Sequence, residues 1–596
     1  MKLLRLKITD PAGFRSLPCG FEHHFRTEWS LQDELAQPEG FAPFVCAGPN
    51  GSGKSNLLEA LAAIFFQLEV LRVRRSFLPE GLQSKEQDFS PIAFELDYLI
   101  RVPAEFRSLG SPEWAKVGVW KDAGESVRFQ WENQSDFDTD AHEAFKGGHA
   151  DILMPQYVLG YSSGENEILS LPFFKMRFVQ FDEYWNALSQ QLPYPGRPET
   201  RLAYLDDSFS QAILLCNLLF QDDATLQLFR EDVGIEALKE FRIILRRSIP
   251  VTRHQVAAFT SGEYVLPTET EDGRFADNNA VHLDPETGDY RLNLLQGLEA
   301  NERTERTSIV EKLKRCATLH FHDEKSDTLI FDYRVNENTK KAFRANFDDS
   351  ALSLFQALQV LLALNLYSVS DALKSDLYTS PSPYVSETVP TLASDERIMR
   401  IKHFYFLKRG VEKPMLLKQL SDGEHQLLHS LGMCLLFRNT NSLFLLDEPE
   451  THFNPDWRAN FISRLRQCLP GDGEFAQEML ITTHTPFLIS DSKPDKVLVF
   501  EKDKATGKVG ISQPNYNTLG ASINKITMST FGKRETIGGY AQGMLDGLRR
   551  RFEEGKEDKE ALITEIHQQL GDSVEKLLLV KTILDGNQEG TKEAQR

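Results

Sequence analysis

The amino-acid sequence predicts an α/β fold in which helices flank a mixed, mostly parallel sheet. Three observations lead to this prediction. From residue 401 onward, short apolar runs alternate with helix-forming segments, as they do in mostly parallel sheets. A glycine-rich loop, 48–55, stands between an apolar run and a long helix-forming segment. Another apolar run, 443–446, ends in two carboxylates, and we expect it to carry them to the sheet edge beside that loop.

The bulk composition is that of a globular chain with several domains. Its 596 residues are enough for roughly three to four domains of ~150 residues each. The net charge of −20 argues against a protein that coats nucleic acid, because such domains are usually basic, but it leaves room for a local basic groove. The six cysteines form no C-x-x-C pair, which favours a reduced protein without a zinc site.

The apolar segments predict a cytoplasmic protein. Residues 1–8 alternate apolar and basic side chains, which is typical of a strand and not of the apolar core of a secretory signal. The longest apolar run, 357–369, is too short to span a bilayer. We therefore expect a cytoplasmic location and no membrane partner.

The first hundred residues form the first predicted lobe. Strands are expected at 1–8, 41–47 and 92–100, and a helix at 56–66 directly after the glycine-rich loop. The loop therefore has the strand–loop–helix setting that a phosphate-binding loop needs.

Residues 101–400 are predicted to be an insertion, part β and part helical, with more helix than strand. We expect helices at 208–219, 226–247 and 351–368, and a hairpin formed by 318–322 and 328–333. Prolines recur through the region and no heptad pattern is sustained, which argues against a coiled-coil arm.

Residues 401–501 are predicted to be a second lobe and 502–596 a helical C-terminal region. The second lobe has strand candidates at 401–407, 443–446, 479–483 and 496–500, with a helix at 456–468. The C-terminal region carries a stripe of leucines, isoleucines and valine between 562 and 584. That stripe either packs within its own domain or docks a partner or a second copy.

The loop at 48–55 reads G-P-N-G-S-G-K-S, which fits the pattern G-x-x-x-x-G-K-[ST]. Its glycines let backbone N–H groups point inward, and the start of the following helix adds partial positive charge. Lys54 is expected to reach the β- and γ-phosphates, and the Ser55 hydroxyl to hold Mg²⁺. The cradle itself would comprise the four residues before the lysine, Asn50, Gly51, Ser52 and Gly53.

Two further segments suit hydrolysis of a bound triphosphate. Asp447 ends an apolar strand, where its carboxylate can hold Mg²⁺ through water, and Glu448 is placed to polarise the attacking water. His484 ends another strand candidate and can donate a hydrogen bond to the γ-phosphate.

A fourth segment, 420–426, reads L-S-D-G-E-H-Q. Ser421, followed by Gly423 and a helix start, is an end that binds anions, although an ordinary N-capped helix gives the same pattern. With the other three segments in this order, coincidence is improbable.

The four segments together resemble the ABC-type ATPase head of the RecF and SMC class. Residues 48–55 resemble Walker A, 420–426 the signature L-S-x-G-E, and 443–448 Walker B with its catalytic glutamate. His484 resembles the switch histidine, and 13–17 the opening F-R-G-F-x-S-L. The motifs and the lobes around them cover about a third of the chain.

Residues 447–455 and 483–489 resemble more narrowly the ATPases of prokaryotic defence systems. These include OLD-type nucleases, the Septu ATPase PtuA, which is also found with retrons, and restriction-associated AAA ATPases. The resemblance implies ATP and Mg²⁺ as ligands and ATP hydrolysis as the activity.

The resemblance also implies that two heads face each other with ATP between them. Lys54 and Ser55 of one copy would bind the triphosphate together with Ser421 and Gly423 of the other, so that ATP joins the dimer and hydrolysis releases it. Residues 451–454 would form the loop that communicates across the interface. The family's Q-loop glutamine has three candidates here: Gln83, Gln87 and Gln156.

Differences from the family's pattern exclude some of the related classes of protein. The tail after residue 500 lacks the strand and paired acids of the Toprim nuclease found in OLD-type proteins, and the chain lacks the arm and zinc hook of long SMC proteins. We therefore expect a separate effector, such as an HNH nuclease, to dock on the C-terminal helices. The alternatives are a RecF-like DNA-repair clamp, for which the basic clusters 242–247 and 549–551 would bind nucleic acid, and a less favoured transporter subunit.

Overall fold

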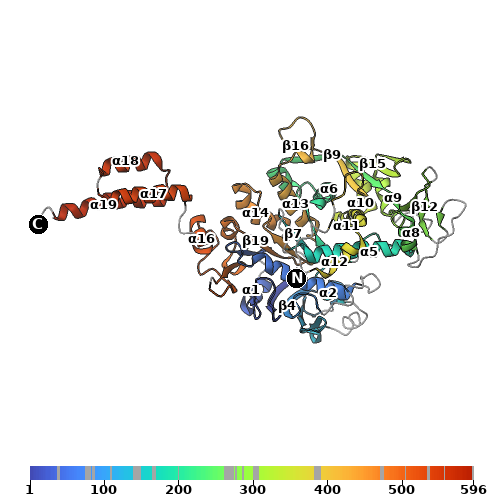
Figure 1. Cartoon of the computed structure of the whole chain (residues 1–596), viewed down its shortest axis with the longest axis horizontal. Coiled ribbons are helices and arrows are strands. Elements are labelled where there is room, and N and C mark those ends of the chain that lie inside the picture. Colours follow the sequence, from blue (N-terminus) through green and yellow to red (C-terminus); the bar gives the residue numbers. More distant parts are fainter. Residues whose placement is uncertain are drawn as a thin grey trace.

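The computed structural model describes most of the chain. The described residues are 1–36, 40–73, 82, 88–107, 110–137, 150–163, 169–198, 200–260, 274–275, 278–284, 287–299, 308–380, 389, 391–469, 475–503, 505–532, 537–555 and 557–593. The fold is α/β, with mixed sheets flanked by helices and a helical C-terminal region (Figure 1).

A seven-stranded sheet forms the centre of the molecule. Its strands run parallel except for the edge strand β21, and their order is β21-β20-β3-β19-β18-β7-β8. Their bounds are β3 Phe44–Ala47, β7 Tyr157–Ser162, β8 Leu202–Tyr204, β18 Ser442–Asp447, β19 Glu478–Thr483, β20 Val497–Lys502 and β21 Val509–Ser512. Residues from the first hundred, the predicted insertion and the second lobe therefore share one sheet.

The central strands are buried on both faces. Every residue of β3, β18 and β19 is buried, which explains why these strands read as continuous apolar runs and not as alternating ones. In register, Asp447 lies beside Ser162 on one side and Thr482 on the other. The carboxyl ends of β3, β18, β19 and β7 thus meet at one edge of the sheet.

Helix α2, Lys54–Arg72, lies between the central sheet and an antiparallel N-terminal sheet. It contacts β18, β19, β7 and β8, while Phe65 meets Tyr98 of the N-terminal sheet at a ring-centroid distance of 5.9 Å. The N-terminal sheet has the order β2-β1-β4-β5-β6. Its bounds are β1 Lys2–Ile8, β2 Glu22–His24, β4 Phe94–Arg101, β5 Trp114–Lys121 and β6 Arg128–Trp131.

Two further antiparallel sheets build the middle of the chain. The larger has the order β14-β15-β9-β16-β17 and the smaller β10-β13-β12-β11. Their bounds are β9 Ile235–Arg246, β14 Leu319–Asp323, β15 Thr328–Arg334, β16 Met399–Lys408 and β17 Met415–Leu416, then β10 Ser248–Val251, β11 Arg274–Phe275, β12 Asn278–Leu283 and β13 Tyr290–Asn293. The predicted hairpin is confirmed as β14–β15.

The prediction of a helix over 226–247 was wrong for most of that range. A short helix, α7 at Gln227–Asp232, ends before Gly234, whose φ of 81° lies in the left-handed region. Strand β9 then runs between β15 and β16, and its alternate residues Phe241, Ile243 and Leu245 are buried. Pairing on both sides, which is a tertiary effect, outweighed the helical spacing of its apolar residues.

The remaining helices cover the sheets. Their bounds are α1 Glu28–Ala36, α5 Leu171–Ser189, α6 Ser210–Phe220, α8 Arg253–Thr260, α9 Ile309–Cys316, α10 Glu337–Asn346, α11 Ala351–Ala363, α12 Asp371–Thr379, α13 Asp422–Leu436, α14 Pro455–Cys468, α15 Pro486–Ser490, α16 Ile523–Thr530, α17 Gly539–Glu553, α18 Lys559–Gln569 and α19 Val574–Glu593. In the described part of the chain, one segment, Ala351–Ser368, is long and apolar enough to cross a membrane, so the expectation that the apolar run of this region is too short to do so was wrong. The segment is mostly buried against α5, α6 and β16, as a core helix is.

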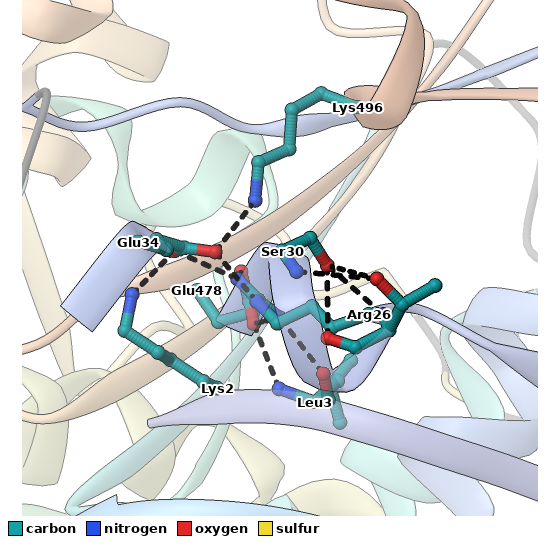
Figure 2. A network of polar contacts seen from close by, with 8 residues as sticks. Lys2, Leu3, Arg26, Ser30, Glu34, Glu478 and Lys496 are labelled. Atoms are coloured by element: carbon teal, nitrogen blue, oxygen red, sulfur yellow. Dashed lines mark hydrogen bonds and ion pairs between the residues drawn. The ribbon is translucent and has the colours of Figure 1, made fainter. Parts of the chain in front are cut away.

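A buried ionic network, which we call the β19 brace, ties the N-terminal sheet to the start of β19 (Figure 2). Arg26 donates to Glu478 Oε2 at 2.6 Å and to Glu34 Oε2 at 2.8 Å. The backbone N–H of Leu3 donates to the same Glu478 oxygen at 2.8 Å, and Lys496 pairs with Glu34 at 3.1 Å. Arg26 and Glu478 are both buried, so the network joins segments more than 450 residues apart in sequence.

Helices α17, α18 and α19 form a small unit of their own, standing apart at the left of Figure 1. They share a separate apolar core that includes Leu545, Ile566 and Ile583. Another face of α19 leaves Leu577 and Leu578 exposed, by 66% and 55%. The predicted apolar stripe is therefore divided between packing in its own unit and an uncovered face.

Candidate functional site

The loop before α2 has the backbone shape of an anion cradle. Gly53 has a φ of 99°, and Gly48 a φ of 149° with its α-carbon so close to β20 that a Cβ would lie 2.4 Å from the Phe500 carbonyl oxygen. Only glycine fits these two positions without strain. Ser52 Oγ is buried beside them without a hydrogen-bond partner.

Lys54 is buried against its own loop. Its Nζ donates to the carbonyls of Gly48 and Pro49 at 3.1 and 3.2 Å and lies 3.1 Å from His484 Nε2. Burial lowers the pKa of Lys54, against the opposing effect of the nearby carboxylates Glu448 and Asp447. The lysine is thus desolvated and held at the point where an anion would meet it.

Asp447 joins the loop to the end of β18. Its Oδ1 accepts hydrogen bonds from Ser55 Oγ at 2.8 Å and Thr482 Oγ1 at 2.5 Å. Burial raises the pKa of Asp447, and these two hydrogen bonds oppose the shift. A hydroxyl and a carboxylate oxygen side by side are the hard ligands that Mg²⁺ prefers, so the donor set fits that ion.

Glu448 adopts an unusual backbone conformation directly after Asp447. Its φ is 50°, in the left-handed region that a non-glycine residue rarely occupies. The backbone N–H of Glu448 donates to Thr482 Oγ1 at 3.0 Å, which fixes this turn. Functional sites are where such strain is usually retained.

His484 lies between the acid and the lysine. Its Nε2 is 3.0 Å from Glu448 Oε1 and 3.1 Å from Lys54 Nζ. As a donor this nitrogen binds Glu448, and as an acceptor it receives a hydrogen bond from Lys54, so it serves one partner at a time. The hydrogen bond from His484 is the main reason that the pKa of Glu448 is lowered, which keeps the carboxylate ionised.

The structure thus brings together Lys54, Ser55, Asp447, Glu448 and His484 at one sheet edge. The signature residues have a different surrounding. Ser421 caps α13 and exchanges hydrogen bonds with Glu424. Gly423 lies against the loop after Glu448, since a Cβ there would be 2.6 Å from the His452 carbonyl.

Sequence reasoning missed several residues at the site. Thr482 organises Asp447 and Glu448, and only its place two residues before His484 could have pointed to it. Ser162 Oγ, beside Asp447 in the sheet, is buried without a partner. Ser163 binds the backbone carbonyl of Asp447 at 3.1 Å and the Thr451 hydroxyl at 2.8 Å. The described start of the polar segment, residues 161–163, therefore borders the site, and 164–167 lie outside the described residues.

Glu450 supports the segment that carries His484. Its carboxylate accepts a hydrogen bond from Thr483, whose hydroxyl oxygen also accepts from the N–H of Thr485 at 3.0 Å. The other oxygen, Oε2, is buried without a partner. Burial raises the pKa of Glu450 to about 7, so the neutral form is favoured inside the fold.

One Q-loop candidate lies at the wrong end of the sheet. Gln156 precedes β7, and its Oε1 accepts from the N–H of Asn441 before β18 starts. The phosphate loop lies at the other end of these parallel strands, so Gln156 is excluded as the Q-loop residue. The other two candidates, Gln83 and Gln87, lie outside the described residues.

The basic clusters considered as nucleic-acid contacts are neutralised in part. Arg242 pairs with Asp332 at 2.6 Å, and Arg247 with Glu299 and with Asp327. In the C-terminal unit, Arg551 pairs with Glu557 and Glu565. Arg246, Arg549 and Arg550 have no acid partner among the described ion pairs, so the pairing halves the positive charge that these clusters could offer to a phosphate backbone.

Comparison with known proteins gives one family match and several structural likenesses. The family model described as "AAA domain, putative AbiEii toxin, Type IV TA system" matches residues 298–490, about a third of the chain. No curated protein matches the sequence.

Seventy-two chains of solved structures match. One is an SMC head bound to the C-winged helix domain of ScpA, with 9% identity, coverage of 86% of this chain and 98% of that chain, and a TM-score of 0.30. Another is the SMC head domain from Thermotoga maritima, with 12% identity, coverage of 87% and 100%, and a TM-score of 0.27. The fold assignment rests on the sheet order and on the geometry of the site.

The fold and the site define a P-loop ATPase. Its loop–helix unit, the carboxylate at the end of the neighbouring strand and the following glutamate have the arrangement with which ATPases of this class bind and hydrolyse a nucleoside triphosphate. Within the chain, residues 298–490 are similar to the AAA domain of AbiEii-like proteins.

Proposed function

We propose that this protein is an ABC-type ATPase that hydrolyses ATP at a site completed by a second copy of the chain. One observation carries the proposal: three distant segments place Lys54, Asp447 and His484 together, while Ser421 is hydrogen-bonded within its own helix cap. A hydrolytic half-site and a signature half-site are the two parts that a head-to-head dimer would combine.

The residues of the hydrolytic half-site have separable roles. The loop from Asn50 to Gly53 and the side chain of Lys54 bind the phosphates, and Ser55 with Asp447 holds Mg²⁺. Glu448 accepts a proton from the attacking water, and His484 orients Glu448 and the terminal phosphate. ATP supplies the phosphoanhydride bond, and Mg²⁺ neutralises the charge that develops on its oxygens.

The loop after Glu448 supports coupling between the two half-sites. The N–H of His452 donates at 2.9 Å to Gln426 of α13, which we call the signature helix. The Thr451 hydroxyl donates to the Glu448 carbonyl at 2.8 Å. Residues 451–454 thus touch both the catalytic glutamate and α13 of the same copy. Contact of this loop with a second copy would therefore affect the positions of both Glu448 and α13.

We further propose that the ATPase regulates a separate effector nuclease, of the HNH class, in antiphage defence in the cytoplasm. The exposed face of α19 supports a docking role, because Leu577, Leu578 and Leu584 are each more than half exposed. The unit that carries them has a core of its own, so it can present that face without rearranging the ATPase.

The test of dimerisation uses Glu448→Gln. We expect this variant to bind ATP, to hydrolyse it about 10²- to 10³-fold more slowly, and to form a dimer when ATP and Mg²⁺ are added, as measured by light scattering. Glu501→Gln, an exposed glutamate on β20, is the matched control and is expected to behave as the native protein. Native turnover by Glu448→Gln, or a monomer at saturating ATP, would overturn the proposal.

The effector is tested by purifying the native complex and measuring its mass and composition. We expect a nuclease to copurify with the native chain and to be lost from Leu577→Asp/Leu578→Asp, while ATP-dependent dimerisation is kept. A partner without nuclease activity on DNA or RNA would contradict the effector proposal and leave the ATPase proposal intact.

A further inference from the structure

A groove of about 590 Å³, which we call the signature groove, opens beside the start of α13. Its walls are β16, the short 3₁₀ helix η7 at Leu417–Gln419, the 3₁₀ helix η5 at Asp207–Phe209 and the end of α11. A volume of this size falls within the range of small-molecule sites, roughly 300–1,000 Å³. No part of the proposed ATP site lines it.

Positive charge dominates the described lining. Lys402 and Lys418 are exposed lysines with no carboxylate partner among the described ion pairs. Arg397 and Arg400 donate to the backbone carbonyls of Leu392 and Ser394, and neither has an acid partner among the described ion pairs. Four cations without a described acid partner, against one lining carboxylate, Asp207, predict an anionic occupant.

The side walls have a different chemistry. Arg177 is held by Asp206 at 2.9 Å and lies over the Phe209 ring at 4.9 Å from its centroid. Leu366, Met399 and Phe404, all largely buried, also line the groove. Apolar and aromatic side chains together with cations suit a base and a phosphate, respectively.

The groove is connected directly to the signature. Lys418 belongs to η7, which ends two residues before Ser421, and Gln419 folds back to accept from the N–H of Leu416 at 2.8 Å. At the end of β16, Lys408 pairs with Glu424 of the signature helix. An occupant that contacts β16 and η7 therefore acts on the two elements that hold the capped end of α13.

We propose that the signature groove is a second nucleotide site, which takes a phosphorylated nucleoside and regulates the ATPase through α13. The ligand is either a free nucleotide or the 5′-phosphorylated end of a strand, since both present the same chemistry. The regulatory part of this inference rests on the proposed ATPase; the binding part does not.

Binding is measured by titration calorimetry on the full chain carrying Lys54→Ala, so that the ATP site is silent. The probes are AMP, GMP, the 5′-phosphorylated dinucleotide of thymidine and a 5′-phosphorylated twelve-nucleotide DNA. We expect at least one probe to bind, and Lys402→Glu/Lys418→Glu to weaken it more than tenfold. Lys413→Glu is the matched control, because this exposed lysine lies in the turn between β16 and β17 and outside the groove.

The probes also identify the source of the ligand. Tighter binding of the mononucleotides assigns a free nucleotide, and tighter binding of the longer probes assigns a strand end. Failure of every probe to bind at millimolar concentration overturns the proposal, as does equal weakening by Lys413→Glu.

Regulation is read from the ATPase rate of the chain with Lys54 intact. We expect the bound probe to change this rate at least threefold, and the Lys402→Glu/Lys418→Glu variant to keep its basal rate but lose the change. A rate that never responds to a bound probe overturns the regulatory part. If the chain has no ATPase activity at all, the calorimetric result still decides whether the groove binds nucleotides.

Discussion

The two ends of strand β19 differ in whether their buried polar groups are paired. At its start, Glu478 belongs to the β19 brace, where Arg26, Glu34, Lys2 and Lys496 satisfy one another (Figure 2). At its other end, beyond Thr483, the protein keeps a strained glutamate, a desolvated lysine and buried hydroxyls without partners. The first end, which we call the closed end, has its charges paired within the chain. The second, which we call the open end, keeps polar groups that a ligand could satisfy.

The difference separates stability from chemistry along a single strand. Charges that are buried and paired cost desolvation, but removing one partner leaves the other uncompensated and is far costlier. Polar groups that are buried and unpaired cost stability at once and are retained where a ligand satisfies them. Substitutions at the two ends should therefore give opposite results in assays of stability and of activity.

The largest effect is expected from Lys54→Ala at the open end. Loss of the lysine that we propose to bind the phosphates should lower ATP hydrolysis by more than about 10²-fold, with thermal stability within a few degrees of native. Rates are measured by phosphate release, with Lys502→Ala on the exposed end of β20 as the control. Retained turnover would remove this loop from the site.

Arg26→Ala should give the reverse result at the closed end. Glu478 would be left buried without its main partner, and the free energy of unfolding should fall by about 3–5 kcal/mol. Below its lowered melting temperature, the variant should hydrolyse ATP at close to the native rate. The double variant Arg26→Met/Glu478→Leu should recover much of the stability, because it removes both charges together; the comparison fails if the double variant is as unstable as the single one.

Glu450→Gln addresses the pH dependence of stability. The folded-state pKa of Glu450, about 7, lies above its ordinary value of 4.5, so its contribution to stability is fully present below about pH 4.5 and is lost as pH rises through about 7. Relative to native protein, the variant should gain up to ~3 kcal/mol between these pH values. Denaturant unfolding across the range measures this; parallel pH profiles of the two proteins would contradict it.

Ser162→Ala is expected to have the smallest effect. Because its hydroxyl has no partner, the substitution should leave stability unchanged or raise it by up to ~1 kcal/mol, and lower ATP affinity a few-fold. The control is Ser442→Ala at the opposite end of neighbouring β18, where the hydroxyl is paired with Thr440. The control should lose stability and keep its ATP affinity; identical behaviour of the two variants would refute the contrast.

Sequence patterns located the open end well. The loop containing Lys54, the strand ending at Asp447 and the histidine at 484 each have a local signature, and the α/β fold follows from the buried parallel strands that carry them. The residues that complete the site had none: Thr482 and Ser162 act through register with Asp447, which only the folded sheet reveals.

The closed end was not predictable in the same way. Arg26 and Glu478 are ordinary charged residues in their local context, and their pairing depends on strands that meet across most of the chain. Strand β9 was predicted as helix for the same reason, since its neighbours β15 and β16 start about 80 and 150 residues after β9 ends. Long-range pairing is the information that local patterns lack.

The position of β3 in the sequence delays its pairing during biosynthesis. This strand carries the phosphate loop, yet both of its partners in the sheet, β19 and β20, are encoded more than 400 residues downstream. At translation rates of ~5–20 residues per second, its apolar edges wait roughly 20 to 90 seconds for those partners. A growing chain therefore exposes an aggregation-prone strand for most of its synthesis, and its yield in cells should depend on chaperones that bind nascent polypeptides.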